Sequence, residues 1–386
     1  FQNFNGSFKG INFLASKPFS ASYDAKNNSV KVEYLTLSSV DNFLSVKSLL
    51  YSLKERKLNL DVEKSVVRLD NFVSNISGRI EGGFSLELSD ENLKLSADTV
   101  FKEVSYLYFK NLDGELKIDN NELKLTGKGK LFESQLDFAI TSGDIFSEVY
   151  SFKINLSELW ITNLFKFNTR SISPQETFFK KIQYSIFVEN LYYDKFKCRN
   201  FNISGEVLPG KMTISQATGE IFSGKIALNG KLEDKILSLS LSYQRGKLIE
   251  FSKVFFSDNK KIYGNLYLDG NVLLKNFDFS TLEGVFSGKI EYGEFQNVFM
   301  LEELKNFLFE IPLDHIYFDR ILFDISVKDS KVEINKLSLD SKNIVSEVKG
   351  DYNIKNNFVY FNIFLSFAKS YLNNLPNVAS IFLQGK

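Results

Sequence analysis

The strongest constraint on the fold is a side-chain alternation with a period of two, clearest across residues 184–243. Leu237, Leu239 and Leu241, for example, are each followed by a serine. Such a period is typical of strands that have one apolar face and one polar face. Gly, Asp and Asn residues recur roughly every ten positions, a spacing that favours antiparallel hairpins. The alternation therefore predicts an antiparallel sheet with one apolar side.

The same pattern extends over most of the 386 residues and predicts roughly two dozen strands. At about 4.8 Å per strand, one flat sheet would run on the order of 100 Å, which open sheets do not sustain without curling or splitting. We therefore expect a mostly β fold: either a long, curled antiparallel β-sheet forming an open groove or taco-shaped trough of stacked repeats, or a set of sandwiches. Small-residue turns are expected to end the repeats, at Gly114, Gly127, Gly205, Gly230, Gly270 and Gly350.

A few short amphipathic helices are expected to interrupt the strands. Residues 157–167 (SELWITNLFKF) break the period of two, and 299–309 (FMLEELKNFLF) place leucines on one face opposite charged residues. We also expect helical structure at 368–383 and a helical turn at 48–54.

The chain shows no flexible linker, so the boundaries that we expect are soft. The expected division has three parts: residues 1–156 as the N-terminal part of the β-groove, 157–177 as a helix and loop boundary, and 178–386 as the C-terminal β-groove region.

Composition excludes several classes of function. Lys plus Arg and Asp plus Glu balance at 47 each, so no basic field would attract nucleic acid. The 39 phenylalanines are unusual, and they would fill either a compact core or a groove that holds an apolar ligand. No apolar run is long enough for a membrane-spanning helix. Because both ends of the sequence look cut, we expect an excerpt of a longer chain whose anchor lies outside it.

Residues that carry catalytic or metal chemistry are scarce. His315 is the only histidine and Cys198 the only cysteine, so a catalytic triad or a zinc cluster lacks its partners. Residues 127–130 (GKGK) resemble a phosphate loop superficially, but a hairpin turn is the favoured interpretation. Carboxylates are plentiful, yet nothing in the sequence singles out a catalytic pair. The sequence predicts neither an enzyme nor a bound metal or cofactor.

The order of several weak motifs resembles a known family. Residues 152–168 (FKINLSELWITNLFKFN) are followed by a variable segment, by 184–207 (YSIFVENLYYDKFKCRNFNISGEV) and by 210–232 (GKMTISQATGEIFSGKIALNGKL). This order resembles the C-terminal region of AsmA-like proteins, the AsmA/TamB-type bridge-like lipid transfer proteins of the bacterial envelope. Residues 221–225 (IFSGK) stand at the place of the family's glycine hairpin.

Later segments extend the resemblance. Residues 282–308 look like the family's glycine strand with a following helix, 331–367 like its closing strands, and 370–386 like its closing helix. Residues 44–71 resemble a strand-turn-strand unit found near the start of these proteins. The match covers mainly 148–386, and Phe, Lys and Asn replace the family's usual alanine richness.

The resemblance implies lipid transport in the cell envelope. Such proteins are membrane-anchored in the inner membrane of a Gram-negative-type bacterium, extend through the periplasm and take part in outer-membrane biogenesis. Phospholipid acyl chains would move along the apolar inside of the β-groove, without a cofactor. Partners would be phospholipid, the inner membrane through a segment outside this excerpt, and inner- or outer-membrane proteins. The residues that we expect to line the groove are Met212, Ile214, Ile226, Leu228, Phe323, Ile325, Val327, Val359, Phe361, Ile363 and Leu365.

Three alternatives stay open at this point. The groove residues would instead form the dry core of a sandwich. The protein would be a structural or assembly factor for outer-membrane proteins, adding a client strand to its sheet edges. An enzyme acting on envelope glycans is the third.

Overall fold

The computed structural model describes residues 5–8, 11–72, 75–90, 92–164, 179–255, 261–276, 278–296, 315–342, 344–356 and 358–368. The helix expected at 299–309 lies outside these residues, as does the helical structure expected beyond residue 368. The chain forms two compact units, Phe1–Glu189 with Glu206–Pro209, and Asn190–Gly205 with Gly210–Lys386. The division passes through β13 (Lys181–Tyr193) and β14 (Phe196–Leu208).

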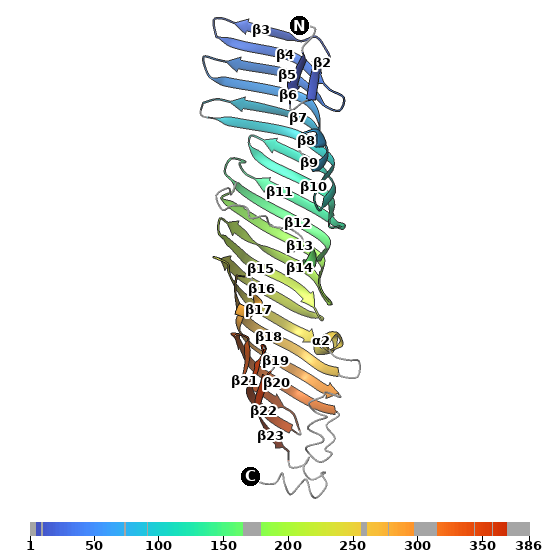
Figure 1. Cartoon of the computed structure of the whole chain (residues 1–386), viewed down its shortest axis with the longest axis vertical. Coiled ribbons are helices and arrows are strands. Elements are labelled where there is room, and N and C mark those ends of the chain that lie inside the picture. Colours follow the sequence, from blue (N-terminus) through green and yellow to red (C-terminus); the bar gives the residue numbers. More distant parts are fainter. Residues whose placement is uncertain are drawn as a thin grey trace. The chain divides into compact units, whose positions relative to one another are not determined.

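The first unit is a meander of antiparallel strands. From β4 onwards each strand pairs with the next one in the chain, whereas β2 and β3 share one edge of β4 (Figure 1). Two short helices, η1 (Leu69–Asn71) and α1 (Ile161–Leu164), interrupt or follow the strands. The strands are β1 (Asn5–Phe8), β2 (Ile11–Ala15), β3 (Ser20–Asp24), β4 (Ser29–Ser38), β5 (Phe43–Ser52), β6 (Lys57–Arg68), β7 (Ile76–Leu88), β8 (Leu93–Tyr106), β9 (Phe109–Asp119), β10 (Glu122–Leu131), β11 (Ser134–Ser142) and β12 (Val149–Trp160).

The second unit repeats this plan, and each strand from β15 to β23 pairs antiparallel with its neighbour in the chain. The helix α2 (Leu248–Phe255) follows β17, and η2 (Phe279–Thr281) precedes β19. The strands are β15 (Lys211–Ile221), β16 (Gly224–Glu233), β17 (Ile236–Lys247), β18 (Lys261–Lys275), β19 (Glu283–Gln296), β20 (His315–Lys328), β21 (Lys331–Asp340), β22 (Ile344–Asn353) and β23 (Phe358–Phe367).

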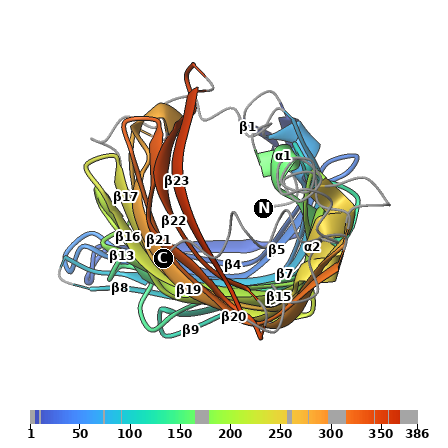
Figure 2. The same cartoon turned by 90° about the horizontal axis from the view of Figure 1, so that it is seen from below.

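The long strands of each unit are bent, so that each sheet is curved and has a concave and a convex side (Figure 2). The pairings among β1 to β12 and among β15 to β23 are antiparallel, and many of them contain a register shift. Such bulges bend a strand and increase its twist. The predicted fold class, a mostly β chain with a long, curled antiparallel sheet and short helices, is confirmed.

Tight two-residue turns connect many strands. The hairpin expected at 221–225 is present between β15 and β16, and similar hairpins join β9 to β10 and β7 to β8. The two central residues of these tight turns have positive φ, which gives a twist that matches that of the flanking strands. Examples are Asn120 with Asn121, Phe222 with Ser223, and Asp234 with Lys235.

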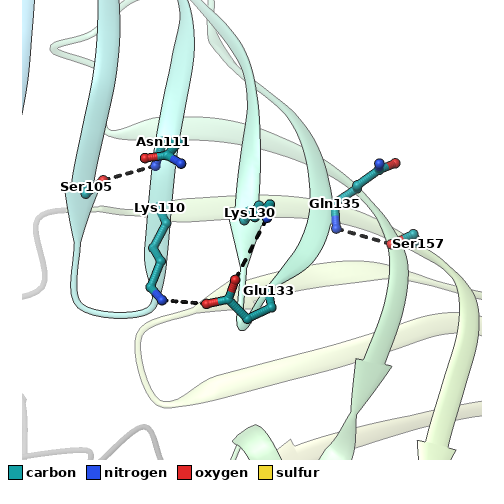
Figure 3. Close-up of polar contacts among 7 residues, drawn as sticks. All are labelled: Ser105, Lys110, Asn111, Lys130, Glu133, Gln135 and Ser157. Carbon is teal, nitrogen blue, oxygen red and sulfur yellow. Dashed lines mark hydrogen bonds and ion pairs between the residues drawn. The ribbon is translucent and has the colours of Figure 1, made fainter.

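Side chains accept hydrogen bonds from backbone amides at places where the pairing between strands is interrupted. In the first unit, the Asn111 amide donates a hydrogen bond to Ser105 Oγ at 3.0 Å, and the Gln135 amide donates to Ser157 Oγ at 3.2 Å (Figure 3). The Glu133 carboxylate also accepts a hydrogen bond from Lys110 Nζ. These exposed contacts give the backbone amides at the irregular ends of β8 to β12 a hydrogen-bond partner within the protein.

Two local expectations about helices need correction. Residues 48–52 belong to β5, where Leu49 pairs with Val32 on one side and Leu60 on the other, and no helical turn forms there. Residues 157–160 continue β12, so the helix expected from 157 begins only at Ile161 and is four residues long in α1. In both places pairing with neighbouring strands overrides a local helical pattern. Within the described ranges, no helix is long and apolar enough to cross a membrane.

Candidate functional site

The principal feature of the second unit is a continuous apolar face on its sheet. Residues paired across neighbouring strands point to the same face, so the register shows which side chains lie together. One such row crosses the sheet from β16 to β23. Its members are Leu228, Leu241, Gly270, Phe286, Ile325, Ile334, Gly350 and Phe361. We call the side of β15 to β23 that carries this row the apolar face.

The structure places all the predicted groove residues on this apolar face. The row beside the first contains Ile214, Val327 and Val359, and the row on its other side contains Ile226, Phe323 and Ile363. Met212 and Leu365 lie in the outer rows. The register thus joins residues that are up to 153 positions apart in the sequence, from Met212 to Leu365.

None of these side chains is fully buried. Val359 and Ile363 are exposed, at 49% and 40%, and the others are half-buried. The dry core of a sandwich would bury them, because a second sheet would cover the face. Half-burial is instead what a curved sheet produces when neighbouring side chains on one side shield each other. The apolar face is therefore partly accessible to solvent.

Several phenylalanine rings lie flat across a glycine of the neighbouring strand. A Cβ atom added to Gly270 would lie 2.4 Å from Phe286 Cδ1, and one added to Gly288 would lie 2.5 Å from Phe323 Cζ. A Cβ atom added to Gly350 would likewise lie 2.5 Å from Phe361 Cδ1. These rings therefore lie over the backbone of the neighbouring glycines.

This arrangement corrects the expectation that glycines mark turns between repeats. All six of the glycines assigned to turns lie within strands. In the apolar rows, a glycine is needed where the ring of a cross-strand phenylalanine occupies the space of a side chain. This holds for Gly114, Gly127, Gly270 and Gly350, whereas Gly230 lies against Leu239.

The helix α2 is fastened to one margin of the sheet through the β15–β16 hairpin. Ser223 Oγ donates a hydrogen bond to Glu250 Oε1 at 2.6 Å, and the Phe222 and Phe251 rings meet edge to face at 5.6 Å. Beneath them the Tyr243 hydroxyl donates to the Ile221 carbonyl at 2.8 Å. Burial, with a smaller contribution from the Glu250 carboxylate, raises the pKa of Tyr243 to about 12. This margin is thus closely packed, in contrast to the open apolar face.

Sequence reasoning missed α2, although a signal was present. Leu248, Phe251 and Ser252 follow the spacing of one helix face, and Leu248 and Ser252 are buried. The segment is only eight residues long and continues directly from β17, so its helical period is too short to stand out.

The opposite side of the same sheet is polar. Lysine and glutamate side chains two residues apart on one strand form ion pairs there, at 2.6 Å for Lys289 with Glu291 and 3.2 Å for Lys349 with Glu347. Exposed pairs of this kind contribute about 0–1 kcal/mol each. Their main consequence is a neutral, water-facing surface, which distinguishes this side from the apolar face.

The first unit carries an apolar face of its own. One row runs from β5 to β10 and contains Val46, Val62, Phe84, Ala97, Ile118 and Leu123. In the next rows Phe101 pairs with Gly114, and Phe138 with Gly127. The sequence analysis named no residue of this face, although the alternation of Leu58, Leu60 and Val62 indicates a strand with one apolar side.

The polar residues singled out in the sequence are not arranged for catalysis. His315 Nδ1 lies 2.6 Å from Glu294 Oε1 on the polar side of β19 and β20. Burial raises the pKa of the Cys198 thiol, the opposite of what an activated nucleophile needs. Residues 127–130 lie inside β10 and not in the hairpin turn that we expected. The described ranges contain no group of three or more His, Cys, Asp or Glu residues placed to hold a metal ion.

Comparison with known proteins adds no family assignment: no protein-family model matches the chain, and a search of curated proteins finds no match either.

Proposed function

We propose that the protein carries phospholipids, whose acyl chains lie on the apolar face while their head groups stay in water. The observation that carries this proposal is the half-burial of a continuous apolar surface across β15 to β23. A surface of this size that is left accessible to water marks an interaction site in soluble proteins.

The chemistry of the face suits a sliding ligand. Its central rows consist mainly of aliphatic and aromatic side chains, and the hydroxyl of Tyr243 among them is already engaged by the Ile221 carbonyl. Contact with such a surface contributes about 25 cal/mol per Å² of apolar area and imposes no directional bond. At Gly270 and Gly288 the rings of Phe286 and Phe323 lie over the backbone of the neighbouring strand. An acyl chain would therefore be held without being fixed at one position.

The resemblance to AsmA-like proteins supports the same proposal and extends it to a cellular setting. The protein would act in the periplasm of a Gram-negative-type bacterium, tethered to the inner membrane by a segment outside residues 1–386. Its lipids would pass between the inner and outer membranes, so it would take part in outer-membrane biogenesis as a bridge-like lipid transfer protein.

The test uses a matched pair of neighbouring residues on β16. Leu228→Asp places a charge on the apolar face, and Asn229→Asp places the same charge on the exposed polar side. Native mass spectrometry with lipid extraction measures bound phospholipid, and transfer of labelled phospholipid between vesicles measures activity. We expect the wild-type protein and Asn229→Asp to bind and transfer lipid, and Leu228→Asp to fold but lose at least tenfold of both, since a charge resists burial under an acyl chain.

Two results would overturn the proposal. The first is a wild-type protein that carries no lipid and takes none up from labelled vesicles. The second is a Leu228→Asp variant that unfolds, measured by circular dichroism, because a position in a dry core would not tolerate the charge.

A further inference from the structure

The last strand of the second unit, β23, differs from the others in carrying no charge. Its sequence is FVYFNIFLSF, whereas the neighbouring β22 contains Glu347, Lys349 and Asp351. Every other strand from β15 to β22 also has charged residues. The charged side chains of the polar side therefore end before this strand, where Asn362 and Ser366 take their place.

Large apolar side chains are exposed on both sides of β23. On the side that is polar elsewhere, Phe358 is exposed at 59%, Tyr360 at 53% and Phe364 at 66%. On the apolar face, Val359 and Ile363 are exposed as well. Large exposed apolar side chains on both sides of one strand indicate a partner that covers both sides.

In the part of the chain that the structure describes, no strand pairs with the outer backbone edge of β23. Among the described residues, β23 pairs only with β22, along its whole length and without a register shift. Edge strands are normally shielded by charges, prolines, bulges or short length, and β23 has none of these. By contrast, β3 in the first unit is a short edge strand of five residues that carries Asp24.

The chemistry of this edge favours another strand over a lipid bilayer. A strand edge presents a row of amide and carbonyl groups that must be hydrogen-bonded, and hydrocarbon offers them no partner. A second β-strand pairs these groups and at the same time covers the side chains on both sides of β23. The partner is therefore an extended segment that is itself apolar on both sides and uncharged.

We propose that this partner is β23 of a second copy of the chain, paired antiparallel about a two-fold axis at Asn362. An antiparallel pair centred on one residue brings residues of the same side together, so Phe361 meets Ile363 and Tyr360 meets Phe364. The apolar face of one copy then continues into that of the other. In such a symmetric pair a charged side chain would lie close to the same charge of the second copy, which is destabilising. Because β23 contains no charged residue, this repulsion does not arise. This inference is independent of the proposed lipid transport.

The test is a charge exchange at Asn362, which is exposed and lies at the proposed axis. Asn362→Lys and Asn362→Asp each place two like charges opposite each other in the dimer. We expect the wild-type protein to dimerise in analytical ultracentrifugation and each variant to dissociate, with a dimer dissociation constant raised by about tenfold or more. An equimolar mixture of the two variants should restore the dimer, because lysine then faces aspartate.

A matched control adds a charge to the same side of an inner strand. Ser287→Lys on β19 lies exposed opposite Asp324 and should leave dimerisation unchanged. As a second measurement, Asn362→Cys in a Cys198→Ser background should form an intermolecular disulfide, since Cα atoms of directly opposed residues lie about 4.5–5.5 Å apart, within the range for a disulfide.

Several results would overturn the proposal. The first is a wild-type protein that is monomeric up to its solubility limit. Hydrogen exchange would then show whether another segment of the chain protects the β23 amides, and a vesicle-binding assay would show whether β23 binds neutral phospholipid instead. Dimers that form equally well with Asn362→Lys alone would place the interface elsewhere. Because each readout concerns association, failure here would leave the lipid-transport proposal unaffected.

Discussion

Gly270→Ala should destabilise the protein, although the same change in an unobstructed position usually stabilises. The backbone of Gly270 does not adopt a positive φ, so its conformation alone does not require glycine. An added Cβ would lie 2.4 Å from Phe286 Cδ1, and 3.0 Å from both Phe286 Cε1 and the Val285 carbonyl oxygen. The phenylalanine ring must therefore lift from the sheet for the methyl group to fit.

Two opposing contributions set the size of the effect. Replacing a strand glycine by alanine gains about 0.5–1 kcal/mol from the restricted unfolded chain. Displacing a packed ring costs about 1–3 kcal/mol. We therefore expect a net loss of up to about 2.5 kcal/mol in the free energy of unfolding, measured as a lower urea midpoint by circular dichroism. Gly143→Ala is the control, because nothing lies within 4 Å of its added Cβ, and it should be neutral or stabilising.

A double-mutant cycle isolates the contact with the ring. Phe286→Leu removes the ring, so Gly270→Ala should cost at least about 1 kcal/mol less in that background than in the wild-type protein. A stabilising Gly270→Ala, or a cost that is the same in both backgrounds, would refute the interpretation that glycines on the apolar face make room for flat rings.

Two further predictions concern buried polar contacts. The pKa of Tyr243 is raised to about 12 in the folded protein, so its contribution to stability is present below pH 10 and is lost as the pH rises to about 12. The free energy of unfolding should therefore fall by about 2–3 kcal/mol over this range. In Tyr243→Phe the fall should be less steep. Equal pH profiles of the two proteins would contradict this reasoning. The Asn121 side chain accepts a hydrogen bond from the Leu95 amide at 2.8 Å and donates one to the Leu93 carbonyl at 2.9 Å, and Asn121 has a φ of 74°. Asn121→Ala should therefore lower the free energy of unfolding by about 1–3 kcal/mol and Asn121→Gly by less, in urea titrations, and the reverse order would show that the strained backbone is unimportant.

The sequence determined the class of fold and, within each strand, which alternate residues share one side. A period of two is a local property of a strand, so alternation alone assigns Ile325 and Val327 to one side and Ser326 to the other. The turn at 119–121 was equally readable, because asparagine tolerates the positive φ that this turn requires. Composition alone also bears on function. Balanced charges argue against nucleic-acid binding, and the scarcity of histidine and cysteine argues against a catalytic triad or a zinc cluster.

Only the tertiary structure decided which strands meet and what their pairing does to individual residues. The glycines at Gly270 and Gly350 looked like turns because sequence does not show that Phe286 or Phe361 lies across them. Residues 48–52 looked helical, but the strands on both sides of β5 hold them extended. The half-burial of the apolar face and the open edge of β23 likewise depend on sheet curvature and on neighbours distant in sequence. Pairing between strands is a non-local interaction, and local patterns carry no information about its register.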